Sequence, residues 1–317
     1  MSSGHDWNVW VHSVPQNIEI GLQQGSIYAL VALGYTLVYG VLQLINFAHS
    51  EVFMLGGFGS YLVVDGIVGN RHLTGAMVPI TVACGVISGA LVGAGTAWLL
   101  EKVAYKTLRR SGAPKLAFLI SAIGASLFLS NLAGKLFNHL SNNPFPEYFN
   151  ENRELFHIGS AKFKLLDTII ILTAFAMMIF LDRLVNRTKL GRGIRAVAED
   201  APTAALMGID IDKTISRTFV IGGALAGVAG FMYGSLIGVS NLMGFTPGVK
   251  AFAAAVLGGI GNVRGAMIGG LLLGETEVLI SSMPPVGAQW NDVVSFTVLV
   301  LILLVRPTGL LGERLGR

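Results

Sequence analysis

The sequence predicts an all-α integral membrane protein, a bundle of eight or nine membrane spans in which some helices are broken into half helices. Hydrophobic residues make up 53% of the 317 residues and charged residues only 13%, about half the charged share of a soluble domain. The apolar stretches are continuous and do not alternate with polar residues, which favours helices over a membrane barrel. The 41 glycines allow membrane helices to pack closely. Residues 1–317 are therefore expected to form one transmembrane domain.

The N-terminal part predicts an interfacial segment followed by a first span. Residues 1–17 are polar and contain Trp7 and Trp10, so they are expected to form an extracytoplasmic segment at the membrane interface. Residues 20–50 contain no Asp, Glu, Lys or Arg, which is enough for one span and a turn.

A short apolar stretch predicts a broken helix. Residues 52–64 number only 13 between Glu51 and Asp65. At about 1.5 Å per residue they cannot cross a hydrocarbon core of about 30 Å. Residues 46–50 are therefore expected to interrupt the helices within the membrane. Such breaks occur where the backbone lines a cavity or is buried in protein.

Three further spans are expected in the middle of the chain, at residues 72–100, 116–134 and 168–181, where charged side chains are absent. A basic segment, residues 101–115, follows the first of them, and a mixed polar loop, residues 138–163, follows the second.

The C-terminal part predicts one long helix, a tight helical pair and a last span. Residues 218–249 suit one helix ending near Asn241. The short runs 251–263 and 265–274 indicate two helices packed around three glycines: Gly258, Gly259 and Gly261. Residues 293–305 form the last apolar run.

The charged segment at residues 186–217 lies between two long apolar regions. Within it, residues 195–207 suggest one short helix, since Asp200 before Pro202 suits a helix start and Gly208 suits a stop. Small residues recur on one face of this helix: Ala201, Ala204, Ala205 and Gly208. A smooth face of this kind can dock into a groove on a partner. The alternative is an ordinary connecting loop.

The distribution of basic residues predicts the orientation. If residues 101–115, residues 182–217, Arg264 and the C-terminal tail face the cytosol, they hold 16 of the 22 Lys and Arg residues. This bias satisfies the positive-inside rule and places the C-terminus inside, with the N-terminus outside for nine crossings. The net charge of +4 reflects these loops and does not indicate nucleic-acid binding.

Several polar side chains are expected at membrane depth. Asn46, His49 and Glu51 mark either a translocation path and its gate or a helix cap near the interface. Glu275 and Glu277 are expected to face the surface at a helix end, with a cation site as the alternative. Lys250 is expected to snorkel to the interface.

No catalytic or metal-binding motif is present in the sequence. It contains no G-x-S-x-G, no H-E-x-x-H and no Cys/His metal spacing, and Cys84 is its single cysteine. It also lacks a P-loop, G-x-x-x-x-G-K-[ST], so ATP-driven transport requires a separate ATPase subunit. No cofactor, metal or enzymatic activity is expected.

Several stretches in one order resemble the permease subunits of bacterial ABC importers for branched-chain amino acids, of the LivH type. The resemblance runs from about residue 18 to residue 312 and rests on GLQQGSIYALVALGYTLVYGVLQLINFAHSEVFMLGGF, LGRGIRAVAEDAPTAALMGID, FTPGVKAFAAAVLGGIGNVRGAMIGGLLLGETEVL and RPTGLLG. Permeases of the related importers for urea and short amides share much of this pattern.

The resemblance implies a path-forming subunit in a bacterial inner membrane. Its partners would be two ATP-binding cassette subunits, a second permease in a homodimer or heterodimer, and an extracytoplasmic solute-binding protein. It implies a coupling helix that docks on the ATPase, formed by Glu199, Asp200, Ala201, Ala204, Ala205 and Gly208. Asn46 and His49 match the family's N-F-A-H signature, and Gly258, Gly259 and Gly261 belong to another of the stretches that carry the resemblance. All are candidates for the translocation path, together with Glu51.

A stand-alone carrier or channel is the main competing hypothesis. Such a carrier is expected to show paired intramembrane charges for ion coupling, and the sequence indicates few of them. A membrane-embedded enzyme is disfavoured because no nucleophile or acid–base pair is evident.

Overall fold

The computed structural model describes residues 7–69, 77–137, 144–146, 154–284, 286–306 and 308–312, and these residues are almost entirely helical. The elements are α1 (Trp7–Leu42), α2 (His49–Val68), α3 (Met77–Leu100), a π-helical turn (Glu101–Tyr105), α4 (Lys106–Arg110), α5 (Lys115–Leu136), β1 (Glu154–Ile158), β2 (Ala161–Lys164), α6 (Leu165–Arg187), α7 (Lys189–Glu199), α8 (Ala201–Leu206), α9 (Ile211–Ile237), α10 (Phe245–Gly258), α11 (Val263–Ser281), a 3₁₀ turn (Ala288–Trp290) and α12 (Asn291–Val305).

The helices form a polytopic membrane bundle, as predicted. In the described part of the chain, seven helical stretches are long and apolar enough to cross a membrane. They include α1, α2, α5, α6 and α9. α10 is a shorter apolar helix of 14 residues, and α11 packs beside it. The expected count of eight or nine spans stays a prediction.

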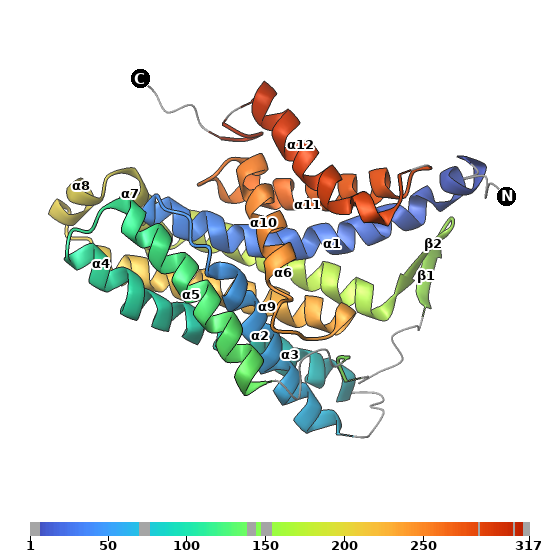
Figure 1. Cartoon of the computed structure of the whole chain (residues 1–317), viewed down its shortest axis with the longest axis horizontal. Helices are drawn as coiled ribbons and strands as arrows, with labels where there is room; N and C mark the ends of the chain where they lie inside the picture. The colour runs from blue at the N-terminus through green and yellow to red at the C-terminus, as the bar shows by residue number, and fades with distance from the viewer. Residues whose placement is uncertain are drawn as a thin grey trace.

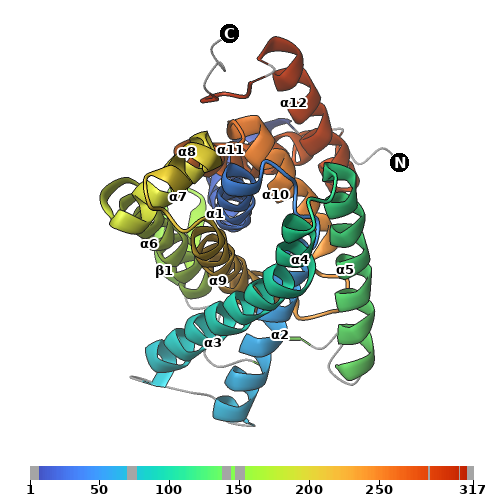
Figure 2. The same cartoon turned by 90° about the vertical axis from the view of Figure 1, so that its left-hand side faces the viewer.

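Helix α1 lies at the centre of the bundle. Figure 2 looks along it and shows α9, α10 and α11 arranged around it. Glycines make this packing possible, since a Cβ added to Gly274 of α11 would collide with the backbone of Gly25 in α1. The α3–α9 contact is equally close, because a Cβ on Gly227 would collide with the carbonyl oxygen of Gly89. The high glycine content therefore does serve close helix packing.

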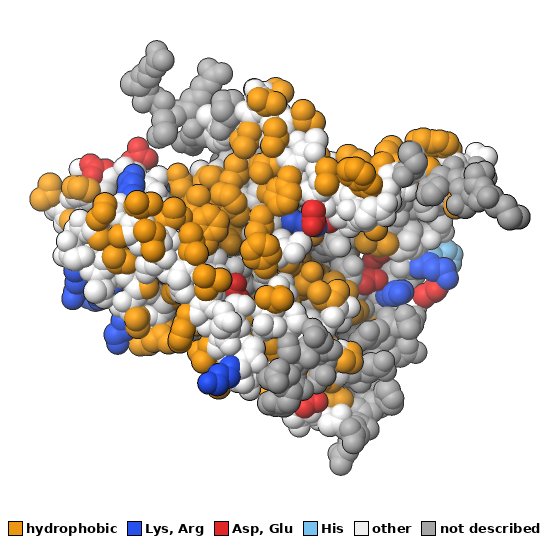
Figure 3. Space-filling view, viewed as in Figure 1, with side chains coloured by type: hydrophobic (Ala, Val, Ile, Leu, Met, Phe, Trp, Pro, Cys, Tyr) orange, Lys and Arg blue, Asp and Glu red, His pale blue; other side chains and the backbone are white. Residues whose placement is uncertain are grey.

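The basic segments of the chain lie at one end of the bundle, where Lys and Arg side chains show in blue at the left of Figure 3, and apolar side chains cover much of the middle of that face. Figure 1 places α4, α7 and α8 at one end, and the β1–β2 hairpin with the start of α1 at the other. Ion pairs between Arg109 and Asp212 and between Arg264 and Asp182 gather the basic segments at the first end. The segments predicted to face one side of the membrane thus lie together.

The predicted break between the first two helices is confirmed, because α1 ends at Leu42 and α2 begins at His49. However, the 13-residue run underestimated the length of the second helix. α2 has 20 residues and includes both Glu51 and Asp65. Buried neighbours let α2 continue through Glu51, which the hydropathy pattern treats as an end.

Other expected boundaries are corrected. Residues 7–17 are helical and form the first turns of α1, and residues 1–6 lie outside the described residues. The place of this segment at the membrane interface stays a prediction. α9 begins within the charged segment, at Ile211, and ends at Ile237, before Asn241. The polar loop contains an antiparallel hairpin, β1–β2, which the sequence pattern did not indicate. The hairpin packs on α1, where Gln16 accepts a 2.8 Å hydrogen bond from the backbone N–H of Lys162.

Candidate functional site

The interruption between α1 and α2 is held by the Asn46 side chain. Its Oδ1 accepts a 3.1 Å hydrogen bond from the N–H of Ala48 and a 2.8 Å hydrogen bond from the hydroxyl of Tyr105. Gln43, just before it, has a φ of 53°, the left-handed conformation that turns the chain out of α1. Asn46 is buried, and its Nδ2 has no hydrogen-bond partner in the described structure. The polar break predicted at this position is therefore a buried feature of the bundle.

His49 is the first residue of α2 and lies against α1. Its imidazole is buried and packs edge to face against Tyr35 with ring centroids 4.8 Å apart, and its Nε2 has no hydrogen-bond partner in the described structure. Gly34 leaves room for the ring, since a Cβ there would collide with the imidazole. His49 thus fixes the position of α2 on α1 beside Tyr35.

Glu51 is buried two residues further along α2, at 4% exposure. Its Oε1 accepts hydrogen bonds from the hydroxyls of Ser126 at 3.0 Å and Ser50 at 3.4 Å. No cation pairs with it among the described residues. A buried carboxylate held by two hydroxyls and no cation is the kind of group that faces a path or a ligand in a membrane.

Glu51 lines a cavity of about 280 Å³, the break cavity, between α1, the interruption, α5 and α10. Its walls are mainly aromatic and aliphatic, with hydroxyl and amide groups near Glu51. The lining residues are Tyr35, Phe47, Ser50, Glu51, Ile123, Ser126, Leu127, Ser130, Asn241, Leu242, Phe245, Val249 and Phe252. An apolar cavity with few convergent polar groups is the usual form of a small-molecule site.

A second and much smaller space, the turn recess, adjoins the break cavity and measures only about 10 Å³, about the size of one water molecule. It is lined by Tyr35, Thr36, Tyr39, Ile45, Phe252, Ala255 and Ile260. Tyr35 and Phe252 line both spaces, and their ring centroids are 6.0 Å apart. The two rings thus form the partition between the break cavity and the turn recess.

Of the three glycines expected in the path, Gly258 ends α10, and Gly259 and Gly261 lie in the turn between α10 and α11. Gly258 packs backbone to backbone on Gly265, and Gly259 and Gly261 have φ of 107° and 92°. A side chain at either of these positive-φ positions would strain the turn. None of the three lines the break cavity, although Ile260 between them lines the turn recess.

The expected roles of Lys250 and Glu277 are wrong. Glu277 is 1% exposed and so does not face the surface. Its carboxylate forms a 2.8 Å ion pair with the ammonium of Lys250. Lys250 is also buried and does not reach the membrane interface. Lys250 also lies 2.8 Å from Oδ1 of Asp292, and the hydroxyl of Ser295 donates to Glu277 at 2.8 Å. This network joins α10, α11 and α12. Glu275, by contrast, is half-buried on α11 beside Gly21.

The expected single helix at residues 195–207 is two helices, α7 and α8, that meet at Asp200. Asp200 ends α7 in an extended conformation and caps α8, accepting hydrogen bonds from the N–H and the hydroxyl of Thr203. These hydrogen bonds hold the pKa of Asp200 below its usual value. The predicted start at Asp200 and stop at Gly208, with φ of 83°, are therefore present in a shorter helix.

Part of the small-residue face of α8 packs against the rest of the chain, and part of it is exposed at the surface. Ala204 is buried, whereas Ala205 and Gly208 are exposed, Ala201 is half-buried and Glu199 is exposed. The largest exposed apolar side chains of this end follow Ala205, with Leu206 at 89% and Met207 at 79% exposure.

A polar cluster connects this end of the bundle to the interruption. Glu101, in the π-helical turn, accepts hydrogen bonds from Arg109 at 3.1 Å and from Ser216 of α9 at 2.6 Å. Arg109 pairs in turn with Asp212 at 2.6 Å. Tyr105, which bonds Asn46, lies in the same π-helical turn as Glu101. Sequence reasoning missed Tyr105, Ser126 and Phe252, since no local pattern places them beside residues so distant in the chain.

Comparison with known proteins identifies the family. The family model described as "Branched-chain amino acid transport system / permease component" matches residues 17–303. The chain is 42% identical over 296 residues to the high-affinity branched-chain amino acid transport system permease protein LivH of Escherichia coli K12, covering 92% of this chain and 94% of that protein. It is 41% identical over 304 residues to the corresponding protein BraD of Pseudomonas aeruginosa, covering 94% and 95%.

A more distant relative, the probable branched-chain amino acid transport permease protein LivH of Methanocaldococcus jannaschii, is 27% identical over 305 residues, covering 93% of this chain and 91% of its own length. No solved structure gives a significant match. The chain belongs to the family of permease components of branched-chain amino acid transport systems.

Proposed function

We propose that the chain forms the translocation path for leucine, isoleucine and valine in an ATP-driven importer, and that the break cavity receives the solute. The observation that carries this proposal is the buried Glu51 carboxylate in the wall of an otherwise apolar cavity at a helix break. The ammonium group of an amino acid supplies the cation that Glu51 lacks. An aliphatic side chain fits against walls such as Phe47, Leu127 and Val249.

The same chemistry disfavours the related solutes urea and short amides. Urea carries no cationic group to offset the charge of Glu51 and no alkyl chain to bury against the apolar walls. An amino acid with an ammonium group and an alkyl side chain would bind more tightly, because it contacts both Glu51 and the apolar walls.

Tyr35 and Phe252 are proposed as the gate on this path. Their rings separate the break cavity from the turn recess, which reaches Ile260 in the α10–α11 turn. Because Arg264 of α11 pairs with Asp182 at the basic end of the bundle, the turn recess is the side proposed to face the cytosol. A shift of α10, which carries Phe252, would open the partition.

The partners are proposed from the family. Two ATP-binding cassette subunits, a second permease and an extracytoplasmic solute-binding protein would complete the importer in a bacterial inner membrane. Residues 186–217 would lie in the cytosol, with α8 as the coupling helix. The contact residues proposed for the ATPase are Glu199, Asp200, Ala201, Ala205 and Gly208 together with exposed Leu206 and Met207, while Ala204 anchors α8 to its own chain. ATP hydrolysis would belong to the separate subunits, and this chain would be non-catalytic.

Reconstitution of the purified complex tests this function. The tagged chain is isolated gently from its native membrane, its companions are identified by mass spectrometry, and the complex is placed in proteoliposomes. The expected result is a P-loop ATPase in the eluate and ATP-dependent uptake of labelled leucine that isoleucine and valine compete but urea does not. Uptake by the chain alone without ATP, or competition by urea, would contradict the proposal.

A further inference from the structure

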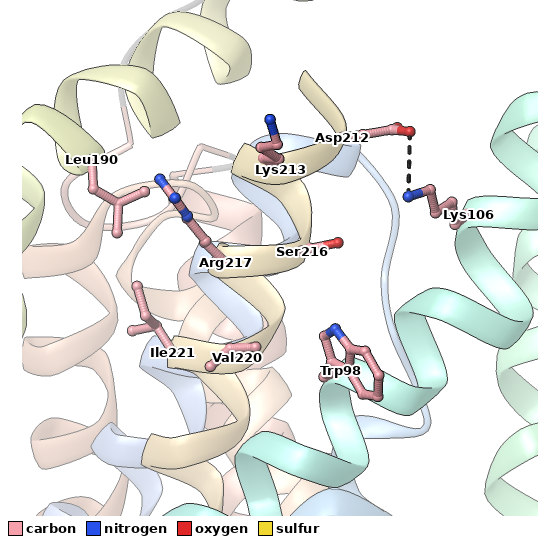
Figure 4. Close-up of a pocket in the computed structure, with 9 residues that line it drawn as sticks. All are labelled: Trp98, Lys106, Leu190, Asp212, Lys213, Ser216, Arg217, Val220 and Ile221. Atoms are coloured by element: carbon pink, nitrogen blue, oxygen red, sulfur yellow. Dashed lines mark ion pairs between the residues drawn. The ribbon is translucent and has the colours of Figure 1, made fainter. Parts of the chain in front are cut away.

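A recess opens between α3–α4, α7 and α9 at the basic end of the bundle (Figure 4). Its volume is about 420 Å³. Charged side chains lie at one end of it, and Trp98, Val220 and Ile221 lie at the other, nearer the middle of the helices. The basic recess, as we name it, is defined by these three residues with Lys106, Leu190, Asp212, Lys213, Ser216 and Arg217.

The charged end of the basic recess carries excess positive charge. Lys106, Lys213 and Arg217 line it, and Asp212 is its single acidic residue. Asp212 already binds Arg109 at 2.6 Å and lies 3.7 Å from Lys106. The negative charge of Asp212 is thus already balanced by basic side chains of α4.

Arg217 is the cation with most capacity to bind a ligand. It is exposed, and no ion pair or hydrogen bond joins its guanidinium to another side chain of the described residues. Lys213 lies one turn earlier on α9 and, among the described residues, forms its ion pair with exposed Asp210, at 3.0 Å. A guanidinium beside an ammonium is the arrangement that binds a phosphate through two parallel hydrogen bonds and an added point charge.

The opposite end of the basic recess is apolar and suits lipid. Trp98 is 44% exposed, and the ammonium of Lys102 lies 4.7 Å from the centroid of its ring. Tryptophan and lysine in this arrangement are typical of the level where lipid headgroups meet acyl chains. Val220 and Ile221 continue the apolar surface along α9, one of the stretches that can cross a membrane.

We propose that the basic recess binds an anionic phospholipid. Arg217 and Lys213 hold its phosphate, Lys106 adds positive charge, and an acyl chain lies along Trp98 and Val220. The apolar half of the recess argues against a soluble phosphate compound, which would leave that surface uncovered. Basic pockets between transmembrane helices on the cytoplasmic side are suited to anionic headgroups.

The site would matter for the proposed importer because of where it lies. α9 follows α8 after four residues, and α7 contributes Leu190 to the recess. A bound lipid would therefore brace the helices that surround the proposed coupling helix. This consequence depends on the proposed function, whereas lipid binding itself does not.

Lipid binding is measured on the purified full-length chain by native mass spectrometry and by titration with phosphatidylglycerol or phosphatidylcholine in detergent. The double variant Arg217→Gln with Lys213→Gln is compared with the single variant Lys115→Gln. Lys115 is an exposed basic residue at the start of α5, outside the recess. The expected result is at least a tenfold loss of phosphatidylglycerol affinity in Arg217→Gln with Lys213→Gln, and no loss in Lys115→Gln. Phosphatidylcholine binding is expected to be weaker and equal in all variants.

A competition experiment distinguishes a phospholipid from a soluble phosphate compound as the ligand. Glycerol 3-phosphate and inorganic phosphate at millimolar concentration are expected to displace little bound phosphatidylglycerol. Effective displacement would assign the recess to a soluble anion and overturn the proposal. Unchanged phosphatidylglycerol affinity in the double variant would also overturn it, and loss of the ATPase subunit from that variant's complex would then identify the recess as a protein contact.

Discussion

The hydroxyl of Tyr105 donates a 2.8 Å hydrogen bond to Oδ1 of Asn46, and this bond ties the helix interruption to the π-helical turn before α4. The same turn holds Glu101, which bonds Ser216 of α9 at 2.6 Å. π-helical turns inside α-helices occur frequently at functional sites. A displacement of the first turns of α9 would therefore reach the wall of the break cavity through a short series of hydrogen bonds.

Replacing Tyr105 with Phe removes this bond and leaves the ring packed. The lost hydrogen bond is worth about 1 kcal/mol, or about a fivefold change in an equilibrium. Leucine transported per ATP hydrolysed is expected to fall, because the interruption would then follow movements of α9 less closely. The matched control is Tyr61→Phe, a buried tyrosine of α2 that packs on Phe145 away from the interruption. An unchanged coupling ratio in Tyr105→Phe would show that the bond transmits nothing.

Because the Lys250–Glu277 pair is buried, removing one of its charges is expected to lower the stability of the protein much more than removing both. Lys250→Met leaves Glu277 buried without a cation, which costs roughly 3–5 kcal/mol. The double variant Lys250→Met with Glu277→Gln removes both charges and is expected to recover most of that loss. Thermal unfolding of the purified chain measures both.

The exposed pair Lys162–Glu154, at 2.6 Å in the hairpin, is the control for this comparison. Lys162→Met is expected to lower stability far less than Lys250→Met does, because solvent screens exposed pairs. Equal losses in Lys250→Met and in the double variant would mean that the charge pair is not the source of stability.

The partition formed by Tyr35 and Phe252 predicts a leak when one ring is removed. Phe252→Ala joins the break cavity to the turn recess. Proteoliposomes that contain this variant are expected to release preloaded leucine without ATP several times faster than wild type. Phe296→Ala, on the exposed side of α12, is the control. If both variants retain leucine equally, the two rings are not the barrier.

The exposed tip of α8 predicts where the ATPase docks. Leu206→Arg places a charge at the most exposed apolar side chain of this helix and is expected to remove the ATPase from the purified complex. Ala204→Arg is not an equivalent test, because Ala204 is buried against its own chain. Ser111→Arg, at an exposed position after α4, serves as the control. Retention of the ATPase by Leu206→Arg would place the contact elsewhere.

Much of the fold follows from the sequence, because a membrane imposes lengths on its helices. The glycines at 258–261 predicted the α10–α11 pair, whereas the interruption was predicted from a 13-residue run that is shorter than α2, which includes both Glu51 and Asp65. Asp200 before Pro202 indicated a helix start, but the pattern did not show that a separate helix, α7, ends at the same residue.

The candidate site was only partly predictable, since its residues meet through tertiary packing. Glu277 follows an apolar run, so the pattern places it at a helix end, and nothing nearby reveals Lys250, 27 residues earlier in the chain. Asn46, His49 and Glu51 were visible because polar groups are rare within such apolar sequence. Their partners Tyr105 and Ser126 come from other helices and carry no signal of their own.

Leucine uptake by the Glu51→Gln variant is the most direct test of the break cavity as the solute path. The reconstituted complex is compared with Glu275→Gln, which changes a half-buried carboxylate of α11 outside the cavity. Glu51→Gln is expected to raise the KM for leucine at least tenfold, because the solute ammonium loses its counter-charge, while Glu275→Gln stays near wild type. ATP-driven uptake by Glu51→Gln with wild-type KM and rate would contradict the assignment of this cavity to the solute.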